Sequence, residues 1–323
     1  MRTRRIAWIL AVLILGAPPL FAQDSSTGSG QVGPVRLLTS GTGGGNDFIA
    51  RDIAQGISGP LGHPVTVENL QGGVAPGEAV AKSAPDGRTV LVYNNTLWIG
   101  PLLQHANYDA ARDFAPVGEL ARTPNVLVVN ASAPAKSVPE LIALARTRPG
   151  ELKYGASGTG AGNHLAGELF GAMAGVKIVP VNYKGIRGAI NDLMEGKLQL
   201  MFPTTVSGAP LVRSGKLRAL GVTSATPTAL LPGVAPVASS GLPGYEAITI
   251  FCAFVPAGTP PAVLDRLNRE MMGYLARPDV KEKLFAAGME VVAGSPAQLA
   301  ATMKSELARM GRVIRDAGIR GGG

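Results

Sequence analysis

The sequence predicts an α/β protein of two lobes, with mainly parallel sheets flanked by helices. Apolar runs typical of strands alternate with segments of helical periodicity, and this alternation favours parallel sheets covered by helices on both faces. The chain has 323 residues, of which 46% are hydrophobic, and this length favours two lobes over one. Two glycine-rich turns, far apart in the chain, each follow an apolar run and open a helical pattern, as expected if each lobe supplies one.

The individual elements follow from hydrophobic period and from boundary residues. The expected strands are residues 35–38, 65–68, 89–92, 125–129, 177–181, 198–202, 219–222 and 248–255. The expected helices are residues 47–61, 76–83, 138–148, 164–174, 186–195, 261–276, 280–287 and 296–317. Ser137 and Glu140 form a capping box, and Ser295 is an N-cap followed by Pro296. Residues 223–245 are rich in Pro, Ala, Ser and Gly without a clear period, which predicts a surface loop.

The amino terminus has the layout of a secretory signal. Arg2, Arg4 and Arg5 precede an apolar run at residues 6–15, and a small-residue exit follows at Ala22. The run is shorter than the roughly 20 apolar residues that a membrane-spanning helix needs. We therefore expect residues 1–22 to be a signal peptide cleaved near Ala22, and the remainder to be a protein of the periplasm.

Composition argues against several classes of function. The formal net charge of +8 includes the three arginines of the signal, and the remaining Lys and Arg residues form no block of the kind that binds nucleic acid. Cys252 is the single cysteine and lies in an apolar run, so we expect a buried structural thiol and no disulfide within the chain. The three histidines and the cysteine lack metal-ligand spacing, so we expect neither a metal nor a cofactor.

The two glycine-rich turns are suited to hold an anion. A helix start offers unpaired backbone N–H groups and the positive end of the helix dipole, and glycine lets an anion approach the backbone closely. We therefore expect one small anionic ligand to be held between the lobes. The candidate ligand-binding residues are Thr42, Gly43, Gly44, Gly45, Asn46 and Asp47 in the first turn, and Ser157, Thr159, Gly162, Asn163 and His164 in the second. For Asp47 and His164 the alternative is a structural role in fixing the turn or opening the helix.

Other candidates follow the strand at residues 89–92. Asn94 and Asn95 lie at its carboxyl end, where open α/β sheets bind ligands, and both side chains are able to hydrogen-bond a carboxylate. We place Trp98 near the mouth of the cleft, where it either stacks on the ligand or packs locally. Lys184 lies near the cleft or is simply solvated.

A series of ordered motifs resembles those of the tripartite tricarboxylate transporter receptor family, the Bug-type periplasmic solute-binding proteins. The resemblance runs from about Val35 to Ile319. Its matched segments are Gly41 to Asp47, Val65 to Asn69, Ala81 to Thr89, Asp113 to Val117, Pro124 to Asn130, Pro134 to Val138, Glu140 to Ala145, Asn163 to Phe170, Tyr183 to Gly185, Ser214 to Leu220 and Pro256 to Pro260.

The resemblance implies a two-lobed periplasmic-binding-protein fold, type II-like, with two crossover strands. By position, lobe one would comprise residues 34–130 plus 254–323 and lobe two residues 131–253, with crossings near 126–131 and 253–256. The two helix-opening turns and water would hold a ligand carboxylate in the cleft. The implied partners are a small carboxylate and the membrane permease of a tripartite transporter, and we expect a monomer.

Departures from the family pattern bear on the ligand. Members often carry an acidic or amide pair where this chain has Pro203 and Thr204, and Pro203 is unable to pair with a ligand ammonium group. We therefore favour a carboxylate whose other end is neutral, apolar or a second carboxylate, and we add Thr204 to the candidate ligand-binding residues.

Two other functions remain open at this stage. A periplasmic ligand sensor for a signalling partner would have the same sequence features as a transport receptor. A secreted hydrolase using Ser157 and His164 is the less favoured reading, because the strand-to-helix turns carry neither a G-x-S-x-G elbow nor a P-loop.

Overall fold

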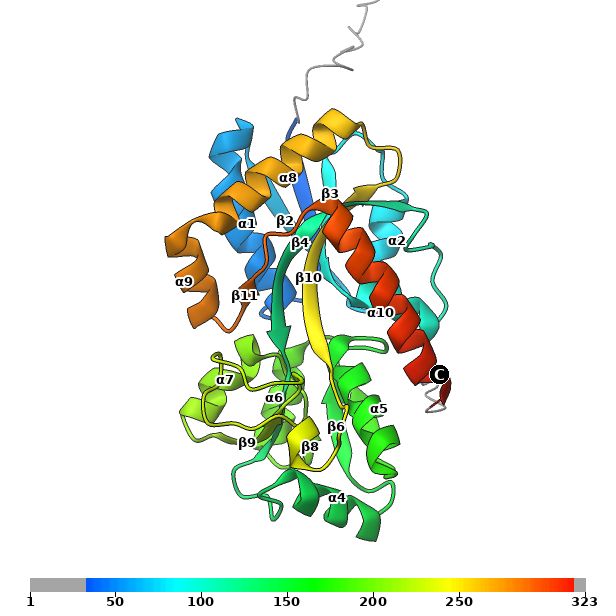
Figure 1. Cartoon of the computed structure of the whole chain (residues 1–323), viewed down its shortest axis with the longest axis vertical. Coiled ribbons are helices and arrows are strands. Elements are labelled where there is room, and N and C mark those ends of the chain that lie inside the picture. Colours follow the sequence, from blue (N-terminus) through cyan, green and yellow to red (C-terminus); the bar gives the residue numbers. More distant parts are fainter. Residues whose placement is uncertain (1–32, 317–323) are drawn as a thin grey trace, which may run out of the picture.

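The computed structural model describes residues 33–316 and shows two α/β lobes stacked along the long axis of the molecule (Figure 1). The expected signal peptide at residues 1–22 lies outside the described residues, as does residue 317 of the last expected helix. None of the helices within residues 33–316 has both the length and the hydropathy of a membrane span.

The first lobe is built on a six-stranded sheet of order β11-β4-β10-β3-β1-β2. Its strands are β1 Val35–Ser40, β2 Val65–Leu70, β3 Thr89–Asn94, β4 Phe114–Pro124, β10 Ile248–Pro256 and β11 Glu290–Val291. Its helices are α1 Gly45–Leu61, α2 Ala75–Ala81, α3 Thr96–Ile99, η1 Gly100–Leu102, α8 Pro261–Ala276, α9 Pro278–Ala286 and α10 Pro296–Asp316.

Successive side chains of the central strands enter different cores of this lobe. Leu37 and Val90 pack with α1, α8 and α9, whereas Leu38 and Leu91 pack with α2, α3 and α10. Figure 1 shows these two groups of helices on opposite sides of the sheet. The alternation explains the consecutive apolar residues at 37–38 in β1 and 90–92 in β3, since both faces of these strands are buried there.

The second lobe is built on a five-stranded sheet of order β7-β6-β8-β5-β9. Its strands are β5 Val126–Asn130, β6 Lys153–Ala156, β7 Val179–Asn182, β8 Leu200–Met201 and β9 Leu217–Val222. Helices α4 Val138–Thr147 and α5 Gly162–Ala174 cover one face, and α6 Ile186–Met194 and α7 Thr205–Arg213 cover the other. Residues 223–245 contain only the short 3-10 helix η2 Ala238–Ser240, in line with the expected loop.

Both sheets are mixed, which corrects the expectation of mainly parallel sheets. Strand β1 pairs in parallel with β2 and β3, but β10 runs antiparallel to β3 and β4, and β5 runs antiparallel to β8 and β9. The reason is that the chain passes from β4 directly into β5 and returns through β10. Strands that carry the chain between lobes in opposite directions are antiparallel where they pair.

The chain changes sheet at Asn125 and again just before β10. Strand β5 pairs only within the second sheet, and β10 pairs along its whole length with β3 and β4. The expected crossings at residues 126–131 and 253–256, and the lobe boundaries drawn from them, are therefore displaced by several residues. Sheet membership supports a division near residues 125 and 247 instead. The hydrophobic pattern could not locate this division between the lobes, because β5 and β10 are almost wholly buried whichever lobe each is assigned to.

Three sizeable elements were not expected: strands β4 and β6 and helix α7. Strand β4 carries Glu119 and Arg122, which are unusual in a central strand. Glu119 is 1% exposed, and its carboxylate is paired with Arg122 and accepts a hydrogen bond from Thr302 Oγ1 at 3.2 Å. These partners from β4 and α10 compensate the buried charge, and no local pattern reveals them.

Candidate functional site

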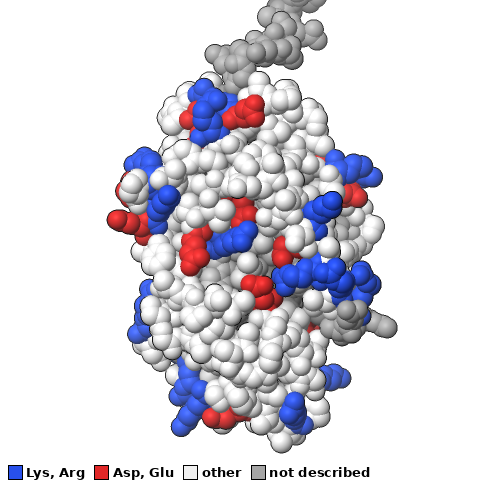
Figure 2. Space-filling model, viewed as in Figure 1, with Lys and Arg blue, Asp and Glu red and all other residues white. Residues whose placement is uncertain are grey.

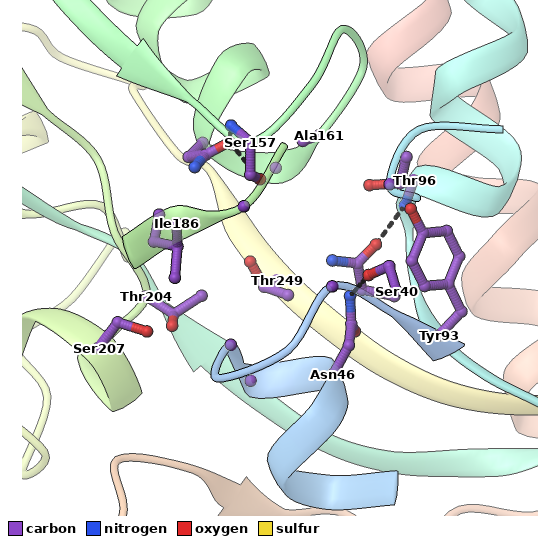
Figure 3. Close-up of a pocket in the computed structure, with 18 of the residues that line it drawn as sticks. Ser40, Asn46, Tyr93, Thr96, Ser157, Ala161, Ile186, Thr204, Ser207 and Thr249 are labelled. Carbon is purple, nitrogen blue, oxygen red and sulfur yellow. Dashed lines mark hydrogen bonds between the residues drawn. The ribbon is translucent and has the colours of Figure 1, made fainter. Parts of the chain in front are cut away.

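The two lobes enclose a cavity of about 90 Å³ where strand ends meet helix starts. Ser40, Asn46, Tyr93 and Thr96 of the first lobe face Ser157, Ile186, Thr204 and Ser207 of the second, and Thr249 of β10 lies between them (Figure 3). The cavity therefore belongs to neither lobe alone. A ligand in it would contact both, so binding is coupled to the approach of the lobes.

Four helices begin at this cavity. The residues that precede α1, α5, α6 and α7 are Gly44, Ala161, Gly185 and Thr204, and each of them lines it. Within residues 33–316, no side chain caps any of these four starts. Uncapped first turns leave backbone N–H groups for a ligand, and each helix adds roughly half a positive charge at its start.

Two helices that begin away from the cavity are capped by their own side chains. Ser137 Oγ accepts a hydrogen bond from the Glu140 N–H at the start of α4, and Ser295 Oγ accepts one from the Gln298 N–H at the start of α10. Both caps were expected from the sequence. Among the described residues, helices α8 and α9 also begin away from the cavity and have no side-chain cap, so the feature that distinguishes the cavity is the convergence of four such starts on one space.

Asp47 fixes the first glycine-rich turn instead of facing the cavity. Its Oδ2 accepts the Gly43 N–H at 2.9 Å, and its Oδ1 accepts Arg51 Nε at 2.8 Å and Asn69 Nδ2 at 2.9 Å. Gly43 has a φ of 78°, which glycine adopts at little cost. Asn46 does line the cavity, and its Nδ2 donates to Ser40 Oγ at 2.9 Å.

His164 has a structural role in the second turn. The side chain is 1% exposed, and its Nδ1 accepts a hydrogen bond from the Gly160 N–H at 3.4 Å. Burial lowers the pKa of the imidazole below its usual value of 6.5, although Glu168 opposes the shift. Ser157 Oγ pairs with Asn163 Oδ1 at 3.2 Å, and the described residues contain no hydrogen bond between Ser157 and His164. The arrangement gives no support to a serine hydrolase.

The structure brings together nine of the fourteen candidate residues. The lining includes Thr42, Gly44, Gly45, Asn46, Asn94, Ser157, Gly162, Asn163 and Thr204. The lining leaves out Gly43, Asp47, Asn95, Thr159 and His164. Their polar groups serve the protein itself: Asn95 Nδ2 donates to the Ile248 carbonyl at 3.1 Å, and Thr159 Oγ1 accepts from Asn182 Nδ2 at 3.2 Å.

Several lining residues were missed or left open by sequence analysis. Thr249 and Phe251 come from β10, Ser207 from the unexpected α7, and Gly72 and Gly73 from the turn before α2. Only the Gly72-Gly73 pair, which follows a strand, carried a local signal. Lys184, for which two positions were open, lines the cavity.

Trp98 and Pro203 lie elsewhere than expected. Trp98 is 1% exposed and packs edge-on against Phe254 with ring centroids 6.2 Å apart, in the core beneath α10 and not at the cleft mouth. Pro203 is buried outside the lining, and its carbonyl accepts the Val126 N–H at 2.8 Å. Residue 203 is therefore set back from the cavity, whereas Thr204 and Ser207 line it.

The lining is neutral apart from one cation. Among the residues that the structure describes, Lys184 contributes the only charged side chain, and no Asp or Glu lines the cavity. Tyr93 is buried, its hydroxyl donates to the Gly73 carbonyl at 2.9 Å, and burial raises the pKa of this phenol well above its usual value of 10.0. On the face shown in Figure 2, Lys and Arg are scattered and interspersed with Asp and Glu.

The comparison with known proteins decides the family. The model of the tripartite tricarboxylate transporter receptor family matches residues 49–319. The chain belongs to this family. A UPF0065 protein in the tcbD-tcbE intergenic region of Pseudomonas sp. (strain P51) is 37% identical over 276 residues, which cover 84% of this chain and 82% of the relative.

Solved structures agree with this assignment. The Rhodopseudomonas palustris protein Rpa4515, solved with adipate, is 35% identical, covers 90% of this chain and 98% of its own, and superposes with a TM-score of 0.84. MatC from the same organism, solved with bound malate, is 27% identical, covers 88% and 99%, and has a TM-score of 0.84. The fold is that of a periplasmic binding protein, and the family is one of solute receptors.

Proposed function

We propose that this protein captures a small carboxylate that lacks an ammonium group, between its two lobes, and delivers it to the membrane permease of a tripartite transporter. The observation that carries the proposal is the convergence of four uncapped helix starts on a cavity with no acidic lining among the described residues. Backbone donors and helix dipoles that point at one small space favour an anion. The adipate and malate found in two similar structures support the same ligand class.

The absence of a carboxylate among the described lining residues argues against amino acids. An ammonium group brought into the cavity would lose its hydration and find Lys184 as the nearest charge in the lining. An unpaired ion in a partly desolvated site is costly. The receptor should therefore prefer an acid over the amino acid of the same carbon skeleton.

Calorimetry with matched pairs tests this function. We expect the mature protein, residues 23–323, to bind succinate more tightly than aspartate and glutarate more tightly than glutamate, by about tenfold or more. A thermal-shift screen of the same acids should show stabilisation, because a ligand that binds only the folded state raises its apparent stability. Tighter binding of the amino acid in both pairs would refute the proposal, as would the failure of any small carboxylate to bind.

The remaining expectations form part of the same proposal. We propose that export removes residues 1–22 and that the receptor acts in the periplasm as a monomer, without catalysis, cofactor or nucleic acid. The described residues contain no group of three or more His, Cys, Asp or Glu that could hold a metal ion. Peptide sequencing of the exported protein would locate the cleavage site, and light scattering would give the oligomeric state.

A further inference from the structure

Lys184 lies where the inner cavity opens outward. It lines the inner cavity and also two outer cavities of about 270 Å³ and about 300 Å³. The first outer cavity is bounded by Thr42 of the first lobe and by the start of α6, and the second by the turns at Gly73 and Gly158. An ammonium group at this junction is in reach of a ligand that extends out of the inner cavity.

Arg187 adds a second cation at the same opening. It lies in the first turn of α6, lines the outer cavity beside Lys184, and belongs to the second lobe. A Cβ placed on Gly43 of the first lobe would lie 3.0 Å from Arg187 Nη2. The guanidinium group therefore rests against the first glycine-rich turn, so the pair of cations spans both lobes.

These two cations have no protein counter-charge in the structure. Within residues 33–316, neither Lys184 nor Arg187 makes a side-chain hydrogen bond or an ion pair, and no Asp or Glu lines the three cavities. Asp192, the carboxylate on α6, is already engaged by the Tyr183 hydroxyl at 2.6 Å and by Lys197 Nζ at 3.1 Å.

Their position is also unfavourable in the absence of an anion. Both cations stand at the positive end of α6, where basic residues are disfavoured and an anion is stabilised. Two like charges at one opening repel each other in addition. An anion bound between the two cations would offset both of these unfavourable terms. On an ordinary protein surface, a neighbouring Asp or Glu would serve this purpose.

We propose that Lys184 and Arg187 form an outer carboxylate subsite, which binds the second carboxylate of a dicarboxylate whose first carboxylate occupies the inner cavity. The proposal rests on the function proposed above and narrows the ligand class to acids charged at both ends. A monocarboxylate fills only the inner site and leaves Arg187, which lines only the outer cavity, without an anion. Because Arg187 sits against Gly43 of the other lobe, the outer subsite is complete only when the lobes are together.

Affinity for paired acids tests the subsite. Calorimetry would compare adipate with hexanoate and succinate with butyrate, on the wild-type protein, on Lys184→Gln, on Arg187→Gln and on the double variant. The wild type should prefer at least one dicarboxylate over its matched monocarboxylate by about tenfold or more, because charge-assisted hydrogen bonds are the strong ones. Arg187→Gln should lose much of that preference while its affinity for the monocarboxylate stays within about twofold, because Arg187 lines only the outer cavity, and the double variant should lose most of the preference.

Lys216→Gln is the matched control. Lys216 is an exposed lysine of the same lobe that lines none of the three cavities, so its replacement removes the same charge and should keep the preference of the wild type. Stopped-flow kinetics separate a subsite from electrostatic steering. If the two cations form a subsite, the variants release the dicarboxylate faster than the wild type does. If the cations only steer anions, the variants bind both acids more slowly, the doubly charged acid most of all, and release them at the wild-type rate.

Three results would overturn the subsite. One is a wild type that binds dicarboxylates no better than monocarboxylates. Another is a double variant that keeps the wild-type preference, and the third is a purely kinetic effect on association. In each of these cases carboxylates still bind, so the proposed function stands. If the wild-type protein binds no carboxylate at all, the proposed function itself is refuted.

Discussion

At the scale of residues, polar groups close to the cavity divide into those that face it and those that build its walls. Asp47 and His164 belong to the turns expected to bind ligand, yet their side chains accept hydrogen bonds from the Gly43 and Gly160 N–H groups. Such contacts hold a glycine-rich turn in one conformation and so leave the remaining N–H groups pointing at the ligand. Their value to binding is preorganisation of the turn.

The structural role of His164 predicts a pH dependence of stability. Burial depresses the pKa of the folded state below 6.5, so the unfolded chain binds the proton more readily in the interval between the two values. The free energy of unfolding should therefore be at its maximum above about pH 7 and should decrease as the pH falls below 6.5 toward the pKa of His164 in the folded state. Urea unfolding at several pH values measures this slope.

His164→Asn should flatten that pH dependence, because Asn retains an acceptor for the Gly160 N–H but has no group that titrates there. His63→Asn is the control, since His63 is exposed, and should keep the slope of the wild type. If the wild type and His164→Asn show the same slope of unfolding free energy against pH, His164 is not responsible for the loss of stability in acid. The Asn variant should still bind ligand, since residue 164 does not line the cavity.

At the scale of elements, the anion site that we propose is formed by the starts of α1, α5, α6 and α7. Two of these starts were expected from their glycine-rich turns, and two were brought to the same point by the fold. Each start offers donors whatever its side chains, and for this reason the lining can consist largely of Gly, Ser, Thr and Asn. Selectivity then depends on what else faces the cavity, namely Lys184, Ile186 and Phe251.

Gly44→Asp should separate folding from binding at α1. Gly44 has φ −99° and ψ 178°, which any residue adopts, and a Cβ there would meet nothing within 4 Å. The new carboxylate should cap α1 and change the free energy of unfolding by less than about 1 kcal/mol. It should also occupy the place of the ligand anion and lower affinity by about a hundredfold, measured by calorimetry.

Gly44→Asn supplies the same shape without the charge and is the control. It should cap the helix equally and bind the ligand more tightly than the Asp variant does. If the two variants bind alike, steric blocking and not charge is responsible. If Gly44→Asp binds like the wild type, the start of α1 does not hold the anion.

At the scale of the whole molecule, the lobes are held together by contacts away from the ligand as well as around it. Thr123 Oγ1 and Thr205 Oγ1 both donate to the Gly288 carbonyl at 2.7 Å, which joins β4 and the turn after α9 to the start of α7. Gln104 Nε2 donates to the Thr159 carbonyl at 3.1 Å across the opposite opening. Because α7 carries Ser207 of the cavity, the first contact links closure to the shape of the site.

Gly288→Ala should prevent full closure. A Cβ on Gly288 would lie 2.8 Å from the Val206 N and 2.9 Å from the Thr205 carbonyl carbon, both backbone atoms of the other lobe. The lobes should stay slightly apart, so ligand affinity should fall by about tenfold or more. Small-angle scattering at saturating ligand should give a larger radius of gyration than the wild type.

Gly258→Ala is the matched control for strain. Gly258 has φ 84° against 93° for Gly288, and a Cβ there would meet only Pro85 Cβ at 3.9 Å, within the first lobe. Both variants should lose stability from the left-handed backbone, by about 1 kcal/mol. Only Gly288→Ala should lose affinity, and equal affinity in the two would mean that this contact does not control closure.

Local sequence was sufficient for the alternation of strands and helices, the two-lobed α/β class, the capped starts of α4 and α10 and the two glycine-rich turns that open helices. These features depend on hydrophobic period, on glycine and on side chains a few residues apart, so each can be predicted from one short segment of the sequence. The ordered motifs added the family, which the comparisons confirm. The same motifs placed nine candidate residues on one cavity, although they are distant in the chain.

Only the tertiary structure decided the rest, because it depends on which segments pair and which faces meet. Glu119 and Arg122 on β4 look unsuited to a central strand until their partners on β4 and α10 are in place. Trp98 follows a strand that ends at the cavity, yet its side chain turns into the core against Phe254. Lys184 is one lysine among many in the sequence, and the meeting of three cavities sets it apart. Long-range pairing has no local signature, and a site assembled from two lobes consists mostly of such pairing.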